Sequence, residues 1–126
     1  MQEFIIYGRL DNLNDYTYAC RASKFGGNTC KKKNEKIVTN SILQDNIQSI
    51  SEDDYPIHLE FNWYEQNGRR DIDNVCFAKK FILDSLSKNN IIIDDNINYV
   101  DGFKDKFYID KDNPRIVVKI FTKNEK

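Results

Sequence analysis

Acidic and basic side chains that could bind a metal ion and a phosphate lie in one short stretch, Arg69-Arg70-Asp71-Ile72-Asp73-Asn74. Asp71 and Asp73 are two residues apart, so in an extended backbone their carboxylates point to the same side and can reach one cation. A second acidic pair, Asp94-Asp95, follows the next predicted helix. Carboxylate oxygens are preferred ligands of hard divalent cations, which can activate water and offset charge on a leaving phosphate oxygen. The pattern predicts a Mg²⁺ site, with Mn²⁺ as an alternative, held by Asp71, Asp73 and Asp95. For the first two acids alone, capping a helix and solvating a turn is the competing interpretation.

Two lysines follow the acidic motif on the predicted helix. Lys80 lies seven residues beyond Asp73, which is about two helical turns and roughly the same face of the helix. We therefore expect Lys80 to contact the scissile phosphate and to stabilise the charge that develops there. Lys79 lies about 100° away around the helix axis. Either lysine could instead cover apolar surface with its alkyl chain.

A second basic region precedes the motif. Between Arg21 and Lys36 six residues are basic and one is acidic, and three of the basic residues are consecutive lysines. Basic clusters beside a metal site favour contact with the phosphate backbone of nucleic acid. A solvated helix start would explain the lysine run if it stood alone. The predicted DNA contacts are Lys31, Lys32, Lys33, Arg69, Arg70 and Lys79.

The hydrophobic pattern predicts the elements that position these residues. Apolar residues recur at helical spacing from about 29 to 50 and from about 74 to 88, and they alternate with polar residues from 57 to 64. The predicted strands are 3–8, 57–64, 98–109 and 115–122. The order β, α, β, α, β, β predicts an α+β fold, a small mixed sheet with two helices packed on it, in a single domain spanning residues 1–126.

Three connections complete this prediction. Residues 16–28 contain Gly26-Gly27-Asn28 and are expected to form a mobile connection. Ile91–Ile93 is a short buried run that should hold the loop carrying Asp94 and Asp95 against the core. The last two strands should be antiparallel neighbours across the turn Asp110–Pro114.

Composition argues against several classes of protein. The chain has 126 residues, 40% of them hydrophobic, and a net charge of −1, as in a folded domain without a general attraction to nucleic acid. Its cysteines, Cys20, Cys30 and Cys76, form no CxxC motif, and with the single His58 they do not match the spacing of zinc ligands. No base partner for a nucleophilic cysteine is evident. No apolar run approaches the roughly 20 residues needed to cross a bilayer, and the first residues do not resemble a signal peptide. We therefore expect a cytoplasmic protein without a membrane partner.

Three segments together resemble the RusA-type Holliday junction resolvases, a family common in phages and prophages. The segments are Arg70-Asp71-Ile72-Asp73-Asn74, Lys80-Phe81-Ile82-Leu83-Asp84-Ser85-Leu86 and Ile93-Asp94-Asp95. The resemblance is best from about Phe61 to Asp105, continues weakly over Pro114–Ile120 and is thin before residue 55. In this family the lysine lies closer to the Asp-Asn pair, whereas here about one extra helical turn separates them.

The resemblance implies a homodimeric, magnesium-dependent endonuclease that resolves four-way DNA junctions in recombination and repair. It also implies that Asp71, Asp73 and Asp95 hold the metal, with Asp94 the less favoured member of its pair, and that Lys80 assists at the phosphate. A four-way junction has near two-fold symmetry, so paired cuts suit two active sites related by the same operator.

Two other functions remain compatible with the sequence. The first is an inactive, structure-selective DNA-binding module of phage origin that has kept the fold, and the extra turn before Lys80 supports it. The second is a different metal-dependent hydrolase that acts on nucleotides. That activity would leave the basic residues between 21 and 36 without a role.

Overall fold

Four strands form one mixed sheet in the order β1-β4-β2-β3 in the computed structural model, which describes residues 1–125. The strands are β1 (Gln2–Tyr7), β2 (Ile57–Glu65), β3 (Val100–Ile109) and β4 (Arg115–Phe121). β4 is antiparallel to both β1 and β2, whereas β2 and β3 are parallel. The predicted α+β fold with a small mixed sheet is confirmed.

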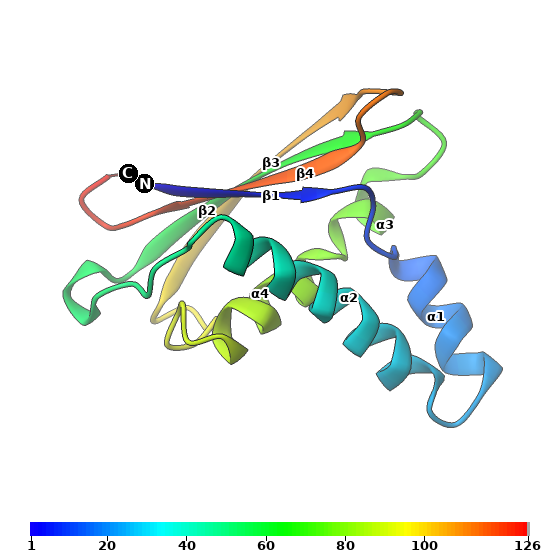
Figure 1. Ribbon diagram of the computed structural model, residues 1–126, viewed down its shortest axis with the longest axis horizontal. Coiled ribbons are helices and arrows are strands. Elements are labelled where there is room, and N and C mark those ends of the chain that lie inside the picture. Colours follow the sequence, from blue (N-terminus) through cyan, green and yellow to red (C-terminus); the bar gives the residue numbers. More distant parts are fainter. Residues whose placement is uncertain (126) are drawn as a thin grey trace.

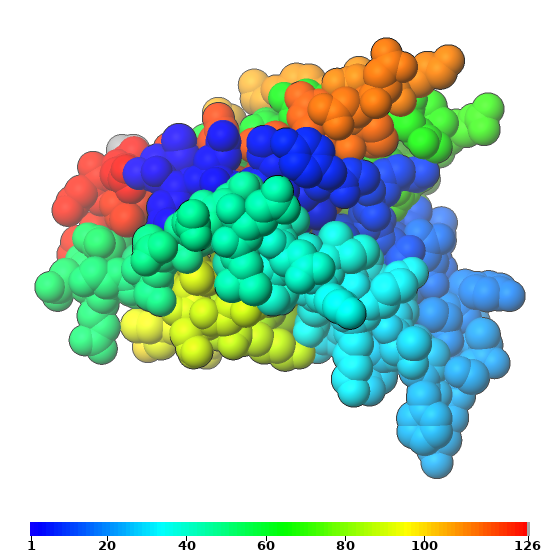
Figure 2. Space-filling view, in the orientation of Figure 1, coloured from blue at the N-terminus to red at the C-terminus, as the bar shows by residue number. Residues whose placement is uncertain are grey.

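The helices cover one face of this sheet and leave the other face open (Figure 1). They are α1 (Leu13–Ala22), α2 (Gly26–Gln44), α3 (Ile72–Cys76) and α4 (Lys79–Lys88), with a short 3₁₀ turn, η1 (Glu52–Asp54). α2 runs across the helical side of the molecule, and the connection between α1 and α2 projects beyond the body (Figure 2). Within residues 1–125, no helix combines the length and apolar character that a membrane crossing requires.

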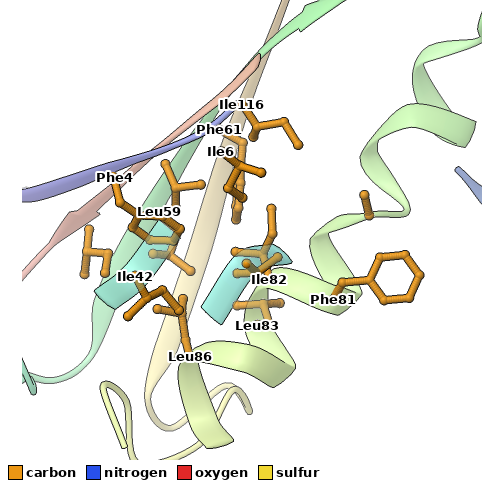
Figure 3. Packing of buried hydrophobic residues seen from close by; sticks show 14 of the residues in the cluster. Phe4, Ile6, Ile42, Leu59, Phe61, Phe81, Ile82, Leu83, Leu86 and Ile116 are labelled. Atoms are coloured by element: carbon orange, nitrogen blue, oxygen red, sulfur yellow. The ribbon is translucent and has the colours of Figure 1, made fainter. Parts of the chain in front are cut away.

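The core lies between the sheet and the helices α2 and α4. On β2 every second side chain from Ile57 to Trp63 is buried, as the period-two alternation predicts. Side chains from β1, β2 and β4 meet those of α2 and α4 in this layer (Figure 3). Among them are Phe4, Ile6, Ile42, Leu59, Phe61, Ile82, Leu86 and Ile116.

α1 replaces most of the mobile connection predicted for residues 16–28, so that prediction is wrong. The helix begins with a capping box: the Asp15 backbone N–H donates to Asn12 Oδ1 (2.9 Å), and the Asn12 N–H donates to Asp15 Oδ2 (3.0 Å). None of the ten residues of α1, all of which the structure describes, is buried. The helix therefore lacks the buried apolar stripe on which a periodicity argument depends.

The helix predicted for about 29 to 50 is present but shorter at its C-terminal end, since α2 ends at Gln44. Asn46 has a positive φ of 53°, a conformation that ends helices. The Ile47 N–H then folds back to donate to the Ile42 carbonyl (3.2 Å). Ile47 is buried through this turn, so its side chain continues the apolar pattern beyond the helix.

The second predicted helix is divided into α3 and α4 at Phe77 and Ala78. The Lys80 N–H donates to the Phe77 carbonyl and the Phe81 N–H donates to the Ala78 carbonyl, each at a distance of 3.0 Å. These bonds span three residues instead of four, which tightens the turn. The Phe77 ring lies at this bend, 5.4 Å from the ring of Tyr16 in α1. The expectation that Lys80 follows Asp73 along one continuous helix is therefore wrong.

The last two strands are not neighbours, contrary to the prediction. β3 is an edge strand beside β2, and β4 lies between β1 and β2. The intervening turn passes the end of β2, where the Asp110 N–H donates to the Glu65 carbonyl (2.7 Å). The apolar residues of β4 that face the helices, Ile116, Val118 and Ile120, are buried, as expected of a central strand. β3, in contrast, is largely exposed.

Candidate functional site

Asp71 and Asp73 lie at the start of α3, just beyond the C-terminal end of β2. Asp71 is the N-cap residue, with an extended backbone (φ −68°, ψ 145°), and its carbonyl accepts from the Val75 N–H. Both side chains are exposed. Within residues 1–125, neither carboxylate takes part in a hydrogen bond or an ion pair. The structure thus keeps both carboxylates accessible and unpaired at one end of the helical segment.

Asp94 and Asp95 lie at the other end of that segment, in the connection from α4 to β3 (Figure 1). Asp94 accepts hydrogen bonds from the Asp95 N–H (2.7 Å) and the Asn96 amide (3.1 Å), whereas the Asp95 carboxylate has no partner among residues 1–125. In the same range, no three His, Cys, Asp or Glu side chains form a group able to hold a metal ion. One chain therefore does not bring Asp95 to Asp71 and Asp73.

The isoleucine run before Asp94 is only partly buried. Ile91 and Ile92 are in the core, but Ile93 is 49% exposed. The Ile93 N–H donates to the Tyr55 hydroxyl (3.0 Å). The loop with the acidic pair is thus attached to the core by its first two residues and to the segment before β2 by a hydrogen bond.

The two arginines before Asp71 differ in their surroundings. The Arg70 guanidinium, with only 13% of the side chain exposed, donates to the Leu10 carbonyl (3.3 Å) and lies 3.4 Å from Glu65 Oε1. Arg9 approaches the same oxygen at 3.7 Å. Burial lowers the pKa of Arg70. Arg70 therefore joins the chain after β1 to the end of β2, whereas the exposed Arg69 side chain has no partner in residues 1–125.

Lys79 is held inside the protein by a network that the sequence analysis missed. Its Nζ is 2.6 Å from Asp105 Oδ2 and lies over the rings of Phe61 (5.4 Å) and Phe103 (4.5 Å). The Trp63 indole N–H donates to Asp105 Oδ1 (2.9 Å). The sequence contains a signal for this network. Asp105 lies between Phe103 and Phe107 on the face of β3 that points toward the helices, and a carboxylate there needs a partner.

Lys80 is exposed, and its one ion pair within residues 1–125 is weak. The side chain is 59% exposed, and Nζ is 3.4 Å from Asp84 Oδ1 one turn along α4. Exposed pairs of this kind are worth only a few tenths of a kcal/mol. The amine of Lys80 thus remains accessible to a ligand, unlike that of Lys79.

The run of three lysines at the start of α2 is partly neutralised by acids. Lys31 lies 3.2 Å from Asp84 Oδ2, and its hydrogen bond to Asp84 raises its pKa. Lys33 lies 2.9 Å from Asp11 Oδ2. Lys32 is exposed and has no ion-pair partner within residues 1–125. Of the three predicted contacts, Lys32 is the one whose charge is not already paired.

Two of the cysteines lie in surroundings that raise the pKa of the thiol. Burial, followed by a hydrogen bond to Asp11, raises the pKa of Cys30 to about 11. Burial also raises the pKa of Cys76. At both positions the raised pKa disfavours the thiolate that nucleophilic chemistry uses.

Comparison with known proteins adds no relationship to this geometry. No model of a known protein family matches the sequence, and no curated protein matches it. Functional interpretation therefore depends on the motif residues and their positions.

Proposed function

We propose that this protein is a magnesium-dependent endodeoxyribonuclease that acts on branched DNA, with four-way (Holliday) junctions as its substrate, in a RusA-like homodimer. The observation that carries the proposal is the pair of exposed, unpaired carboxylates, Asp71 and Asp73, at a strand–helix junction beside the free cation of Arg69. Mg²⁺ is commonly bound by one or two carboxylates together with waters and substrate phosphates, so this donor pair fits the ion. Bound magnesium supplies activation of water and neutralisation of charge on the leaving phosphate oxygen.

The chain's own cations then position the DNA backbone. Arg69 and Lys32 are exposed and have no internal ion pair within residues 1–125, and Lys80 has only its weak contact with Asp84. Free cations gain more from a phosphate than cations that must first give up a carboxylate. Phosphate contacts fix position and do not read sequence, which suits recognition of a branched shape.

Asp95 can complete the site only from a second copy of the chain, because α3 and α4 separate it from Asp71 within one copy. A two-fold axis that brings the start of α3 to the Asp95 loop of the other copy brings the reciprocal pair together as well. Such a homodimer would have two equivalent sites, which matches the two cuts that a junction requires.

Replacement of Asp73 by Asn is the direct test. The exposed carboxylate makes no hydrogen bond or ion pair within residues 1–125, so folding should be unaffected. We expect cleavage of a synthetic junction in Mg²⁺ to fall by about 100-fold or more, because several kcal/mol of charge stabilisation are lost. Junction affinity in a gel-shift assay should stay within about 3-fold, because phosphate contacts dominate binding.

The matched control is Asp112→Asn, which neutralises another exposed carboxylate, in the turn between β3 and β4. It should leave cleavage unchanged. Linear duplex and flap substrates, with and without Mg²⁺, establish whether the activity selects junctions. Full cleavage by Asp73→Asn would refute the assignment.

The bend between α3 and α4 favours a second candidate, a DNA-binding module without catalytic activity. It removes Lys80 from the helical face predicted for a phosphate contact. Junction binding by the wild-type protein without cleavage, across Mg²⁺ and Mn²⁺ titrations, would support this candidate. Turnover of small phosphodiesters in place of junctions would instead indicate a nucleotide hydrolase.

A further inference from the structure

The face of the sheet opposite the helices is not covered by any part of residues 1–125 (Figure 1). Side chains of β2 on this face, from His58 to Tyr64, are half-buried, whereas those on the helical side are fully buried. A sheet with one packed face and one open face is common, but the open face is then polar and mixed in charge. Here its centre combines three lysines with the aromatic rings of Tyr64 and Tyr108.

The positive charge comes from β3 and β4. Strand register places Lys104, Lys106, Arg115 and Lys119 on the open face, together with the acids Glu3 and Glu60. Lys119 and Lys104 each lie 3.9 Å from a glutamate oxygen, at the limit of an ion pair, whereas Arg115 is paired with Asp110 at 2.9 Å. Lys106 has no ion-pair partner in residues 1–125. The centre of this face, around Lys104, Lys106 and Lys119, thus has more lysines than acids in a chain whose net charge is −1.

A hollow of about 290 Å³ lies in the middle of this face. Its lining residues are three lysines, Asn62, Tyr64, Tyr108 and a single acid, Glu60. Amines and an amide beside aromatic rings suit an anionic group attached to a planar one. That combination is the chemistry of a nucleotide.

An aromatic stack at one side of the hollow ends at the edge of the sheet. The Arg115 guanidinium lies 3.8 Å from the centre of the Tyr64 ring, and the Tyr64 and Tyr108 rings are stacked at 4.7 Å. Tyr108 belongs to β3, the edge strand, so no strand lies beyond it, and the residue is 41% exposed. The next position in the stack is therefore open to solvent.

We propose that this face binds single-stranded nucleic acid along β3, with a base stacked on Tyr108 and the backbone phosphates on Lys106 and Lys104. Alternate residues of a strand are about 7 Å apart and share a face, so these three side chains form a line. Stacking on an aromatic ring and contact of phosphates with lysines together hold single strands without reading their sequence.

A second copy of the chain fits this face less well. Packing two such faces together would oppose positive charge to positive charge. Antiparallel pairing of β3 with β3 of another copy, centred on Asp105, would place Lys104 opposite Lys106, which is unfavourable. The inference goes beyond the proposed cleavage and does not need it, because Asp71 and Asp73 take no part.

The test is fluorescence anisotropy with a labelled oligo-dT, and an oligo-U of equal length, each of about twenty nucleotides. Lys106→Glu and Tyr108→Leu should each lower affinity about ten-fold, as expected for loss of one phosphate contact or one stacked base. Lys106→Gln should reduce the slope of log K against log salt by about 0.7. If the substitutions lower affinity equally for oligo-dT and oligo-U, the face binds both DNA and RNA. If they lower affinity for only one of them, that nucleic acid is the ligand.

Lys123→Glu is the charge-matched control, since Lys123 is exposed, unpaired within residues 1–125 and lies beyond the end of β4. It should change affinity by less than about 2-fold. Circular dichroism establishes that each variant is folded. Photocrosslinking of an oligonucleotide containing 5-iododeoxyuridine to the Tyr64 or Tyr108 peptide would support the stacked position directly.

Two results would overturn the proposal. Equal losses for Lys106→Glu and Lys123→Glu would show general attraction instead of a site. A dimer that Tyr108→Leu converts to monomers, with no oligonucleotide binding by the wild type, would assign the face to a second copy. Oligo-dT binding without junction cleavage would support this inference while contradicting the proposed nuclease, so the two failures are distinguishable.

Discussion

Lys79 and Lys80 are adjacent and chemically identical, yet their surroundings give them opposite properties. The Lys79 side chain is 16% exposed and pairs with Asp105 between two aromatic rings, whereas the Lys80 side chain is 59% exposed. Removal of one member of a desolvated ion pair leaves the other charge without compensation. Removal of an exposed lysine leaves only solvent in its place.

We therefore expect Lys79→Met to lower the free energy of unfolding by about 2–3 kcal/mol and Lys80→Met by less than about 0.5 kcal/mol. Adding Asp105→Asn to Lys79→Met should recover part of the loss, because a neutral amide can still accept from the Trp63 indole. Urea denaturation of the three variants measures these differences. Equal destabilisation by the two single substitutions would contradict the structural role given to Lys79.

At the scale of elements, α1 is the part of the fold with the least burial. None of its residues is buried, and its start depends on the reciprocal bonds of Asn12 and Asp15. Asp11, just before it, pairs with Lys33 of α2. Although burial opposes its ionisation, hydrogen bonds from Asn34 and Lys33 hold the Asp11 pKa below its usual value. The helix is thus attached by these polar contacts at its beginning and by the half-buried Tyr16 ring, which packs against Phe77 and Phe81.

Asn12→Ala should consequently loosen α1 without unfolding the protein. Loss of an N-cap costs about 1 kcal/mol, so amide hydrogen exchange in α1 should accelerate about five-fold while exchange in α2 stays unchanged. Asn14→Ala is the control, because Asn14 is exposed in the first turn and makes no side-chain hydrogen bond within residues 1–125. Uniform acceleration across both helices would show that α1 unfolds together with the core.

The elements that sequence reasoning predicted well are those with a regular buried face. The alternation from Ile57 to Trp63 marked β2, and the spacing of Val38 and Ile42 marked α2, because burial imposes these periods. α1 buries no side chain and was missed. The position of β4 between β1 and β2 depends on contacts distant in sequence, which local patterns do not report.

The candidate site follows the same division. The sequence placed Asp71 and Asp73 at a helix start, which is a local property, and the structure agrees. The extended backbone predicted for both residues is found only at Asp71, because Asp73 already lies in the first turn of α3. Whether Asp95 approaches Asp71 and Asp73 depends on the course of the chain through α3 and α4. These helices lead away from Asp71, so that the Asp95 loop lies at the opposite end of them. The roles of these three residues in metal binding remain predictions.

At the scale of the whole molecule, the separation of Asp95 from Asp73 makes the proposed homodimer testable by mixing variants. Asp73→Asn and Asp95→Asn should each be inactive alone. In a mixture, half of the dimers combine the two variants, and each of these has one site with a full set of carboxylates. We expect nicking of a junction to recover to about a quarter of the wild-type level.

Mixing Asp71→Asn with Asp73→Asn is the matched control, since both changes affect the same end of the helical segment and no combination restores a site. No recovery in the first mixture, with dimers demonstrated by light scattering, would assign each site to a single chain. Recovery in both mixtures would exclude shared sites and indicate residual activity of the variants.

The place of β4 in the sheet also has a consequence for synthesis of the protein. β1 and β2 each hydrogen-bond to β4, which is made after both of them. A nascent chain that has emerged only as far as β3 has no strand to fill the gap between its first and second strands. The sheet can therefore close only after Arg115–Phe121 has been synthesised. Until then we expect the apolar residues of β1 to be shielded from solvent by α2 or by chaperones.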